Sequence, residues 1–329
     1  MVQRPSRPDR NIALEMVRVT EAAAIAAARW AGRGNKNAAD GAAVDAMRFV
    51  LEGVSMDGLV VIGEGEKDDA PMLYNGERIG NQQPPEVDIA VDPVDGTTLT
   101  AAGRNGALSV IALAERGSMF NPGPCFYMNK IAVGPRGRGV IDIRASATEN
   151  LKALAQRLGK PVQELGVVVL DRPRHDQLVA EVREAGARVL SITDGDVAGA
   201  VATAWPNSGA DILLGIGGTP EGVIAAAALK GLGGEIQGML HTTDDAIRAQ
   251  ALALGYSFDR VLTADDLVAS ENCFFSATAI TDGDFLRGVR FHDFGATTQS
   301  MVVRSRSGTV RTIETFHRHD KLQEFNTVI

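Results

Sequence analysis

The sequence predicts an α/β protein, because short apolar runs typical of buried strands alternate with segments that have the spacing of amphipathic helices. The chain has 329 residues, of which 45% are hydrophobic, so it can bury one large core or two ordinary ones. Its 36 glycines are enough for the tight turns that alternating strands and helices require. We therefore expect strands and helices throughout the chain.

The first part of the chain is predicted to contain two helices followed by strands. We expect residues 1–8 to be disordered, and Asp9 to cap a helix that ends near residue 30, before two glycines. A second helix is expected from about residue 39, where Val44, Met47 and Leu51 are spaced to share one face. Apolar runs then predict strands at residues 58–63, 86–92, 107–115, 127–134 and 139–143.

From about residue 150 the pattern becomes a regular alternation of helix and strand. Helices are predicted at 147–158, 175–185, after Asp196 and at 220–230, and strands at 166–171, 187–192 and 210–215. This order indicates βαβ units with right-handed crossovers.

The end of the chain is predicted to be mostly strand. Residues 241–270 are expected to form a helical insertion, after which strands follow at 272–280, 300–305 and 308–316. We place a domain boundary near residue 150. It would separate an N-terminal α+β, metal-binding half (1–150) from a C-terminal α/β half (151–329), unless the two form one compact unit.

Composition and charge limit the partners and the compartment. A net charge of −8 and a pI of about 5.2 argue against electrostatic capture of nucleic acid or of an anionic membrane surface. Cys125 and Cys273 lie in apolar surroundings, so we expect buried, reduced thiols rather than a disulfide or a metal site. The apolar runs are too short to span a bilayer, and the N-terminus does not resemble a signal peptide. We expect a soluble, cytoplasmic protein.

Acidic residues collect at the ends of predicted strands and at helix starts, where ligands bind in open α/β sheets. They are Asp40, Glu64, Glu66, Asp68, Asp69, Asp92, Asp95 and Glu221. Carboxylates without His or Cys favour hard cations such as Mg²⁺ or Mn²⁺ over zinc or copper. Two such ions about 4 Å apart could hold a phosphate, activate a water and stabilise the leaving oxygen.

The segment "DPVDGT" is difficult to explain as a simple turn. It follows an apolar strand directly, and Pro93 restricts its backbone while Gly96 allows a ligand to approach. Thr97 then offers a hydroxyl and an amide at an expected helix N-terminus, where phosphate binds well. The segment therefore predicts a site for a metal and a phosphate.

Several single residues also have ordinary structural interpretations. Asp40 taken alone is more often a helix cap than a ligand, and Asp68 could belong to a solvated loop. Asp196 could accept hydrogen bonds from sugar hydroxyls or cap the next helix. His317 and His319 lie in a polar tail and are expected to be solvated. No His is needed for this chemistry, which argues against a phosphohistidine mechanism.

The motif "DPVDGTT" resembles the metal-binding signature of the lithium-sensitive phosphatase superfamily, which includes inositol monophosphatases and fructose-1,6-bisphosphatases. Together with "VVIGEGEKDDAPMLYNGE", "LDRPRH", "ITDGDVAGA" and "GIGGTPEG", it makes the chain similar to class II fructose-1,6-bisphosphatase, from "DRNIALE" to "KLQEF". The resemblance implies a layered α-β-α-β-α sandwich of the sugar phosphatase or inositol monophosphatase-like type.

The resemblance also implies roles for individual residues. Asp40 and Glu64 would hold a first metal ion, Mg²⁺ or Mn²⁺, and Asp92, Asp95 and Glu221 would hold a second. Some family members have Glu at the position of Asp95, so the shorter side chain is expected to change the reach of this ligand. The substrate would be contacted by Asp95, Gly96, Thr97, Tyr127, Arg172, Pro173, Arg174, Asp194, Gly195, Asp196 and Gly218.

Three residues are candidates for the catalytic step. The resemblance implies that Thr97 positions or activates the attacking water. Lys36 could neutralise phosphate, and Asp68 could orient the water or accept its proton. Arg172 and Arg174 leave a predicted strand end together, and guanidinium groups can bind the phosphate that is not cleaved.

The implied reaction is hydrolysis of the 1-phosphate of fructose 1,6-bisphosphate to fructose 6-phosphate, a gluconeogenic step, by direct attack of a metal-activated water. Related alternatives are action on sedoheptulose 1,7-bisphosphate, on both bisphosphates, or on an inositol phosphate.

A nucleotide-dependent kinase is less well supported because no GxxxxGK[ST] motif is present. The apparently complete acid set argues against a silent sugar-phosphate sensor. The resemblance also implies a homodimer or homotetramer.

Overall fold

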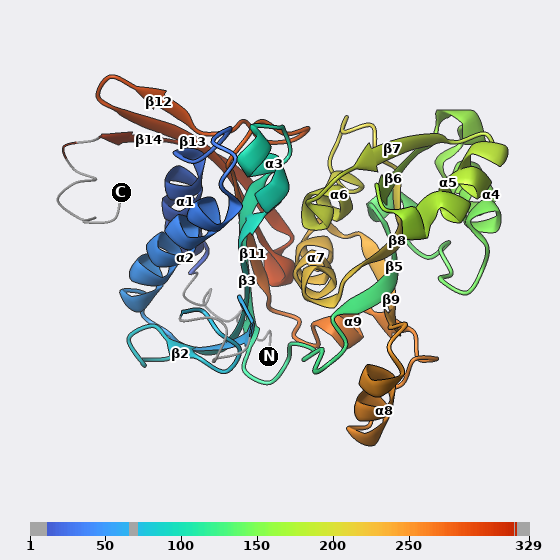
Figure 1. The fold of residues 1–329 in the computed structure, drawn as a ribbon, viewed down its shortest axis with the longest axis horizontal. Coiled ribbons are helices and arrows are strands. Elements are labelled where there is room, and N and C mark those ends of the chain that lie inside the picture. Colours follow the sequence, from blue (N-terminus) through green and yellow to red (C-terminus); the bar gives the residue numbers. More distant parts are fainter. Residues whose placement is uncertain (1–11, 66–71, 319, 321–329) are drawn as a thin grey trace, which may run out of the picture.

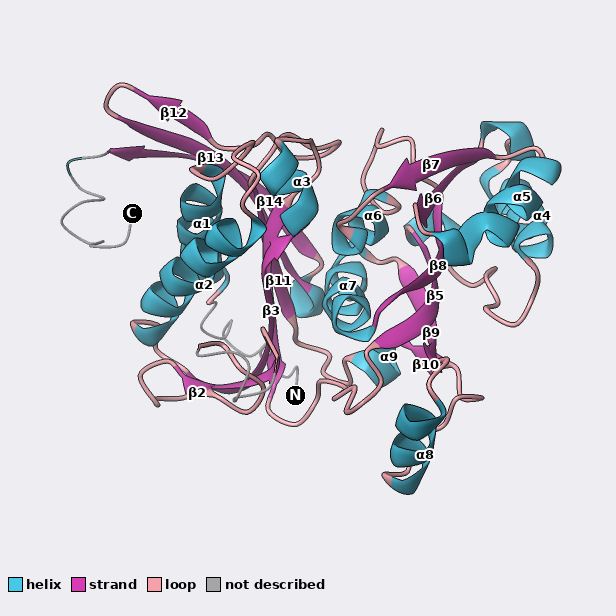
Figure 2. Cartoon of the chain, in the orientation of Figure 1, coloured by secondary structure: helices cyan, strands magenta, loops and turns pink. Residues whose placement is uncertain are grey.

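The computed structural model describes residues 12–65, 72–318 and 320, and its elements stack in five layers (Figure 1). Two β-sheets alternate with three layers of helices, which Figure 2 distinguishes by colour. This α-β-α-β-α order confirms the predicted fold class. The predicted disordered lead at residues 1–8 and the predicted cap Asp9 lie outside the described residues.

The first sheet has eight strands and is mainly antiparallel. Its strands in order across the sheet are β12 (Arg290–His292), β13 (Gly295–Arg304), β11 (Phe274–Ala279), β4 (Leu108–Glu115), β3 (Glu86–Asp95), β1 (Asp57–Ile62) and β2 (Arg78–Ile79), with β14 (Thr309–Arg318) also paired to β13. Among these described pairs, β1 and β3 alone run parallel.

A β-bulge in β3 interrupts the pairing at the "DPVD" segment. Asp92 lies opposite Val110 of β4, and Asp95 lies opposite Leu108, so three steps along β3 match two along β4. Pro93 has no N–H to give to a neighbouring strand, which explains why the irregularity falls there. The strand therefore continues to Asp95 instead of ending at Asp92, as the sequence had suggested.

The second sheet has six strands. In order they are β10 (Leu262–Thr263), β9 (Glu235–His241), β5 (Tyr127–Val133), β8 (Ile212–Gly218), β6 (Gly166–Leu170) and β7 (Arg188–Ile192). The predicted parallel pairing holds for β6 with β7 and with β8, whereas β5 is antiparallel to both of its neighbours. Each sheet contains strands from both sides of residue 150, and the domain boundary there stays a prediction.

Helices cover both outer faces and fill the space between the sheets (Figure 1). The outer layers are α1 (Ala13–Ala28) with α2 (Lys36–Glu52) on the first sheet, and α4 (Ala147–Leu158) with α5 (Asp176–Glu184) on the second. The middle layer holds α6 (Asp196–Ala202), α7 (Thr219–Leu232) and α9 (Ala264–Leu267). Two further helices are α3 (Thr97–Ala102), which follows β3, and α8 (Asp245–Ala253), which projects from the end of the molecule.

Helix α7 is buried along most of its length, because small residues let both sheets approach it. Residues 222–229 are all buried, and four of them are consecutive alanines. A Cβ at Gly222 would overlap Met128 of the second sheet, and a Cβ at Gly231 would overlap Val303 of the first. Glycine at these two positions therefore permits the close packing of the middle layer.

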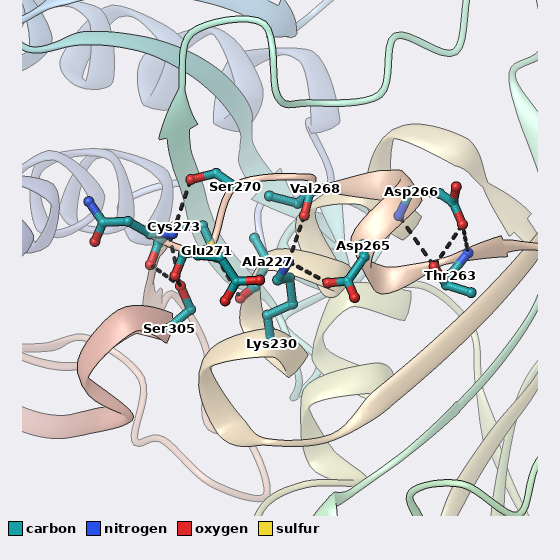
Figure 3. A network of polar contacts seen from close by, with 11 residues as sticks. Ala227, Lys230, Thr263, Asp265, Asp266, Val268, Ser270, Glu271, Cys273 and Ser305 are labelled. Atoms are coloured by element: carbon teal, nitrogen blue, oxygen red, sulfur yellow. Dashed lines mark hydrogen bonds and ion pairs between the residues drawn. The ribbon is translucent and has the colours of Figure 1, made fainter.

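Polar contacts fix the C-terminal end of α7 (Figure 3). The Lys230 ammonium group donates to the carbonyl oxygen of Val268 at 2.8 Å and pairs with Asp265 at 2.6 Å. Nearby, the Ser305 hydroxyl accepts the N–H of Cys273 at 2.8 Å, which ties the end of β13 to the start of β11. These contacts hold α7 against the segment that precedes β11.

Some local predictions were wrong. Residues 139–143 form no strand, since Gly139 has a φ of +83° and follows a short 3₁₀ turn at Pro135–Gly137. The predicted insertion at 241–270 begins with the last residue of the strand β9. This strand was not predicted from the sequence, although its residues alternate between buried and partly buried positions. It contains two helices, α8 and α9, and the short strand β10.

The predictions for Cys and His have mixed outcomes. Cys125 and Cys273 are buried and free, as expected. His317 was expected to be solvated, but its side chain is only 13% exposed because β14 folds back along β13. Its Nε2 lies 2.9 Å from Thr298 Oγ1, and burial lowers its pKa. His319 lies outside the described residues.

Within the described segments, no helix combines the length and the apolar character that crossing a membrane demands.

The middle core yields a stability prediction. Phe275 of β11 is 1% exposed and contacts the core around α7. Phe275→Ala should lower the free energy of unfolding by about 3–5 kcal/mol, because the cavity cannot be filled. Phe294→Ala, at a position that is 70% exposed, should change it by less than about 0.5 kcal/mol. Equilibrium unfolding in urea measures both, and equal effects would contradict the assignment of this core.

Candidate functional site

Five of the acidic residues predicted from the sequence, Asp40, Glu64, Asp92, Asp95 and Glu221, line one cavity of about 580 Å³, while Glu66 and Asp69 lie outside the described residues. Its walls come from both sheets and from the starts of α3, α6 and α7. The predicted site residues that line it are Asp40, Glu64, Asp92, Asp95, Gly96, Thr97, Tyr127, Arg172, Arg174, Asp194, Gly195, Asp196, Gly218 and Glu221. Segments that are far apart in the sequence thus form a single site.

The bulge in β3 explains how Asp92 and Asp95 reach the same cavity. Their partners Val110 and Leu108 are two residues apart on β4 and so lie on the same face of the sheet. The extra residue in β3 therefore places both carboxylates on that face, which is the face covered by the middle layer. The Asp92 carboxylate also accepts the N–H of Val94 at 3.0 Å, which holds the bulge.

The turn after β3 connects this site to the middle layer. Gly96 has a φ of +103°, a conformation that favours glycine, and α3 begins at the next residue. The Asp95 carboxylate accepts the N–H of Ala198 in α6 at 3.1 Å. The short side chain of Asp95 is thus held by a backbone group from the opposite wall.

Asp40 and Glu64 share a hydrogen bond between their carboxyl groups. Burial and the charge of Asp40 raise the pKa of Glu64 to about 8, and burial raises the pKa of Asp40. Helix α2 begins at Lys36 because Asn35 accepts the N–H of Ala38 and caps it. The alternative interpretation of Asp40 as the helix cap is therefore wrong.

The remaining three carboxyl groups are also difficult to ionise. Burial, followed by the charge of Asp95, raises the pKa of Asp92 well above its ordinary value. Burial and the charge of Asp196 do the same for Asp95 and raise the pKa of Glu221 to about 7. The Glu221 carboxylate folds back over the start of α7, where a Cβ on Gly218 would overlap it. The cluster is thus crowded with like charges.

Lys130 is a functional candidate that the sequence analysis missed. It lies in β5, is 3% exposed, and its ammonium group pairs with Asp196 at 2.6 Å. It also donates to the carbonyl oxygen of Gly218 at 2.9 Å. The cap of α6 is Gly195, so the interpretation of Asp196 as a cap is wrong. The signal for Lys130 was a single cation within the apolar strand "YMNKIAV".

A basic and aromatic wall completes the cavity. Arg174 donates to the carbonyl oxygen of Ile216 at 2.8 Å and lies 5.3 Å from the ring centroid of Tyr127. Arg172 donates to the carbonyl oxygen of Asp171 at 2.9 Å. Both guanidinium groups retain free N–H donors, since each has five. The cavity therefore joins an acidic wall to a cationic one.

Three predicted residues do not line the cavity or cannot be placed. Lys36 donates to the hydroxyl of Thr98 at 2.8 Å, just outside the lining. Pro173 begins a 3₁₀ turn between the two arginines. Asp68 lies outside the described residues. Asn75, which the sequence analysis did not consider, lines the cavity and accepts the N–H of Gly63 at 2.9 Å.

The spacing of the acidic side chains in this structure limits how they could hold a metal ion. Among the residues that the structure describes, no three acidic, His or Cys side chains are gathered closely enough to surround an ion. Instead, the carboxylates bond to backbone N–H groups, to Lys130 or to each other.

The family model and the relatives that match this chain are all fructose-1,6-bisphosphatases. A family model described as "Bacterial fructose-1,6-bisphosphatase, glpX-encoded" matches residues 10–317. Similar proteins include "Fructose-1,6-bisphosphatase 1 class 2" of Escherichia coli strain K12 and "Fructose-1,6-bisphosphatase class 2" of Escherichia coli O6:H1 strain CFT073 and of Shigella flexneri. Each is 46% identical to this chain over 325 residues, which cover 95% of this chain and 96% of the relative.

These matches confirm the resemblance that the five sequence motifs indicated. They extend over nearly the whole chain, and described residues from each of the five motifs line one cavity. The chain therefore belongs to the family of bacterial, glpX-encoded fructose-1,6-bisphosphatases, which are phosphatases of class II.

Proposed function

We propose that this protein hydrolyses the 1-phosphate of fructose 1,6-bisphosphate to give fructose 6-phosphate and inorganic phosphate. One observation carries the proposal: a single cavity of about 580 Å³ joins a wall of five carboxylates to a wall with two arginines. A sugar with a phosphate at each end needs two such different walls. The relatives that cover nearly the whole chain bear the name of this activity.

The two walls suggest how the substrate is oriented. Arg172 and Arg174 would bind the phosphate that is not cleaved, because guanidinium groups can donate two parallel hydrogen bonds to phosphate. Asp194 accepts the N–H of Thr98 at 3.1 Å and keeps a second carboxylate oxygen for a sugar hydroxyl. The scissile phosphate would then lie between Thr97 and the carboxylates.

The donor set fits a hard divalent cation. It consists of carboxylate oxygens, and within the described residues one buried oxygen of Glu221, Oε2, has no hydrogen-bond partner. Asp40 and Glu64 would hold one Mg²⁺ or Mn²⁺ ion. Asp92, Asp95 and Glu221 would hold a second, by coming closer together than they lie in this structure. When bound, such ions neutralise phosphoryl oxygens and make the attacking water more acidic. Fructose-1,6-bisphosphatases of this family generally depend on a divalent metal.

The protein's own residues would supply positioning and proton transfer. Thr97 would orient the water that attacks phosphorus, while the bond from phosphorus to the sugar oxygen breaks and that oxygen takes a proton. Lys36 would neutralise phosphate charge, and Asp68 remains the candidate that accepts the proton of the water. No His in the described segments lines the cavity, which supports direct attack without a phosphohistidine.

Lys130 would act by holding the two segments that it touches. Its buried ion pair with Asp196 and its bond to Gly218 fix the starts of α6 and α7 beside Glu221. A cation buried among carboxylates also reduces their mutual repulsion. A gluconeogenic role and a homodimer or homotetramer are expectations that rest on the family resemblance alone, whereas the cytoplasmic location is an expectation from the sequence.

A substrate panel tests the proposal directly. The purified enzyme with Mg²⁺ or Mn²⁺ should release phosphate from fructose 1,6-bisphosphate with the highest kcat/KM. Comparable release from sedoheptulose 1,7-bisphosphate would establish a dual enzyme, and preference for inositol 1-phosphate would replace the proposal. Transfer of phosphate from ATP to fructose 6-phosphate would instead support a kinase.

Asp92→Asn tests the metal site. The change keeps the shape of the side chain but removes its charge, so kcat should fall by about 10³-fold or more while the fold is retained. Thermal stabilisation by Mn²⁺ should also become smaller. Asp245→Asn, at an exposed position of α8, is the matched control and should leave both properties unchanged. Normal turnover by folded Asp92→Asn protein would refute the ligand assignment.

The raised pKa values predict how stability depends on pH when metal is removed. Burial raises the pKa of Glu64 to about 8 and that of Glu221 to about 7, from an ordinary value of 4.5. Between pH 4.5 and 8 the folded, chelated protein therefore binds more protons than the unfolded chain, and its stability should fall as pH rises.

Melting temperatures measured with EDTA from pH 5 to 8 check this prediction. The fall should be smaller in Glu64→Gln, which cannot ionise, and in the native protein with saturating Mg²⁺. A melting temperature that rises steadily over this range in EDTA, with the same slope in Glu64→Gln, would contradict the account.

A further inference from the structure

A second cavity, of about 350 Å³, lies behind the catalytic one. Its floor is mainly apolar and comes from segments on both sides of residue 150, including Leu99, Leu108, Ala198, Ala210 and Phe285. This volume is at the lower end of the range for small-molecule sites, roughly 300–1,000 Å³. The cavity has no role in the proposed reaction.

The remaining lining of this second cavity is polar. Arg104 and Asn105, which follow α3, are exposed, and Ser191 and Thr193 contribute hydroxyl groups. Within the described part of the chain, no ion-pair partner of Arg104 is found. The other charged residues in the lining are Asp284 and Asp194, the second of which also lines the first cavity. An apolar floor with one available cation suits a molecule that has an apolar body and an anionic group.

A single stretch of backbone separates the two cavities. Asp194 and Gly195 line both of them. A Cβ placed on Gly195 would lie 3.7 Å from the carboxylate of Asp95, which lines the first cavity, and 3.7 Å from Cδ1 of Leu99, which lines the second. Gly195 has a φ of +80°, so the wall is thin because it is a glycine in the left-handed region.

The same wall carries two hydrogen bonds to the catalytic residues. The N–H of Ala198, which also lines the second cavity, donates to Asp95 at 3.1 Å. Asp194 accepts the N–H of Thr98 at 3.1 Å, next to Thr97. A molecule that displaces Ala198 or Leu99 would therefore move the groups that hold Asp95 and the start of α3.

We propose that this second cavity is a binding site for a small amphipathic organic anion. The ligand would have an apolar ring body, packed against Phe285 and the aliphatic floor, and a carboxylate, phosphate or sulfonate bound by Arg104. Its binding changes turnover in the first cavity through the wall at residues 194–198. The binding site stands independently of the proposed function, whereas the effect on turnover rests on it.

The probe 8-anilinonaphthalene-1-sulfonate has this chemistry and tests the site by fluorescence titration of the native enzyme. Saturable binding at one site per chain is expected. Arg104→Gln should raise the Kd about tenfold, because it removes the charged donor. Ala210→Phe, which adds a ring to the lining away from the wall, should abolish binding. Both variants should keep the basal turnover of the native enzyme.

Controls distinguish this cavity from other apolar surfaces and from the catalytic cavity. Phe294→Ser removes an aromatic side chain that is 70% exposed and should leave probe binding unchanged. Arg172→Gln, at a residue that lines the catalytic cavity and not the second one, should leave probe binding unchanged. Unchanged binding in folded Arg104→Gln and Ala210→Phe proteins, or loss of binding in folded Arg172→Gln protein, would overturn the site.

The effect on turnover is measured separately. Saturating probe should change kcat or kcat/KM for fructose 1,6-bisphosphate at least twofold in the native enzyme and not in Ala210→Phe. Probe binding without any change in turnover would overturn the coupling but not the site. If the chain proves inactive on fructose 1,6-bisphosphate, the fluorescence titrations still decide whether the site exists.

Discussion

The mutual repulsion of clustered carboxylates is the constraint on which the architecture around the cavity depends. Asp40, Glu64, Asp92, Asp95 and Glu221 line one cavity, and burial raises the pKa of every one of them. The fold opposes this repulsion with backbone N–H groups, a shared proton and a buried ammonium group. Such a cluster is unfavourable for stability alone, so its presence is best explained by chemistry that needs concentrated negative charge.

The five-layered fold makes this concentration possible. Helix α7 packs between the sheets because its alanines and glycines let both sheets approach. Its start carries Glu221 toward β3, and the contacts of Lys230 at its other end hold it against the segment that precedes β11 (Figure 3). The position of Glu221 relative to Asp92 therefore depends on packing along the whole middle layer, and core substitutions far from the cavity can affect the site.

Lys130 and the wall at residues 194–198 show how few contacts join the parts of the site. Lys130 links the second sheet to the starts of α6 and α7. Ala198 and Asp194 link α6 and its preceding turn to Asp95 and to α3, across the gap between the sheets. Because both cavities share these segments, a change in one has a direct physical route to the other.

The sequence by itself determined the alternation of strands and helices, the family and the charged residues that line the cavity. Such features follow from local periodicity and from motifs that can be read along the chain. It did not reveal Lys130, the burial of His317 or the second cavity. It also placed the end of β3 at Asp92. A spacing of three residues in a regular strand puts two side chains on opposite faces, and only the pairing of β3 with β4 shows the bulge that brings Asp92 and Asp95 together. These outcomes depend on contacts between segments distant in sequence, which only the tertiary structure decides.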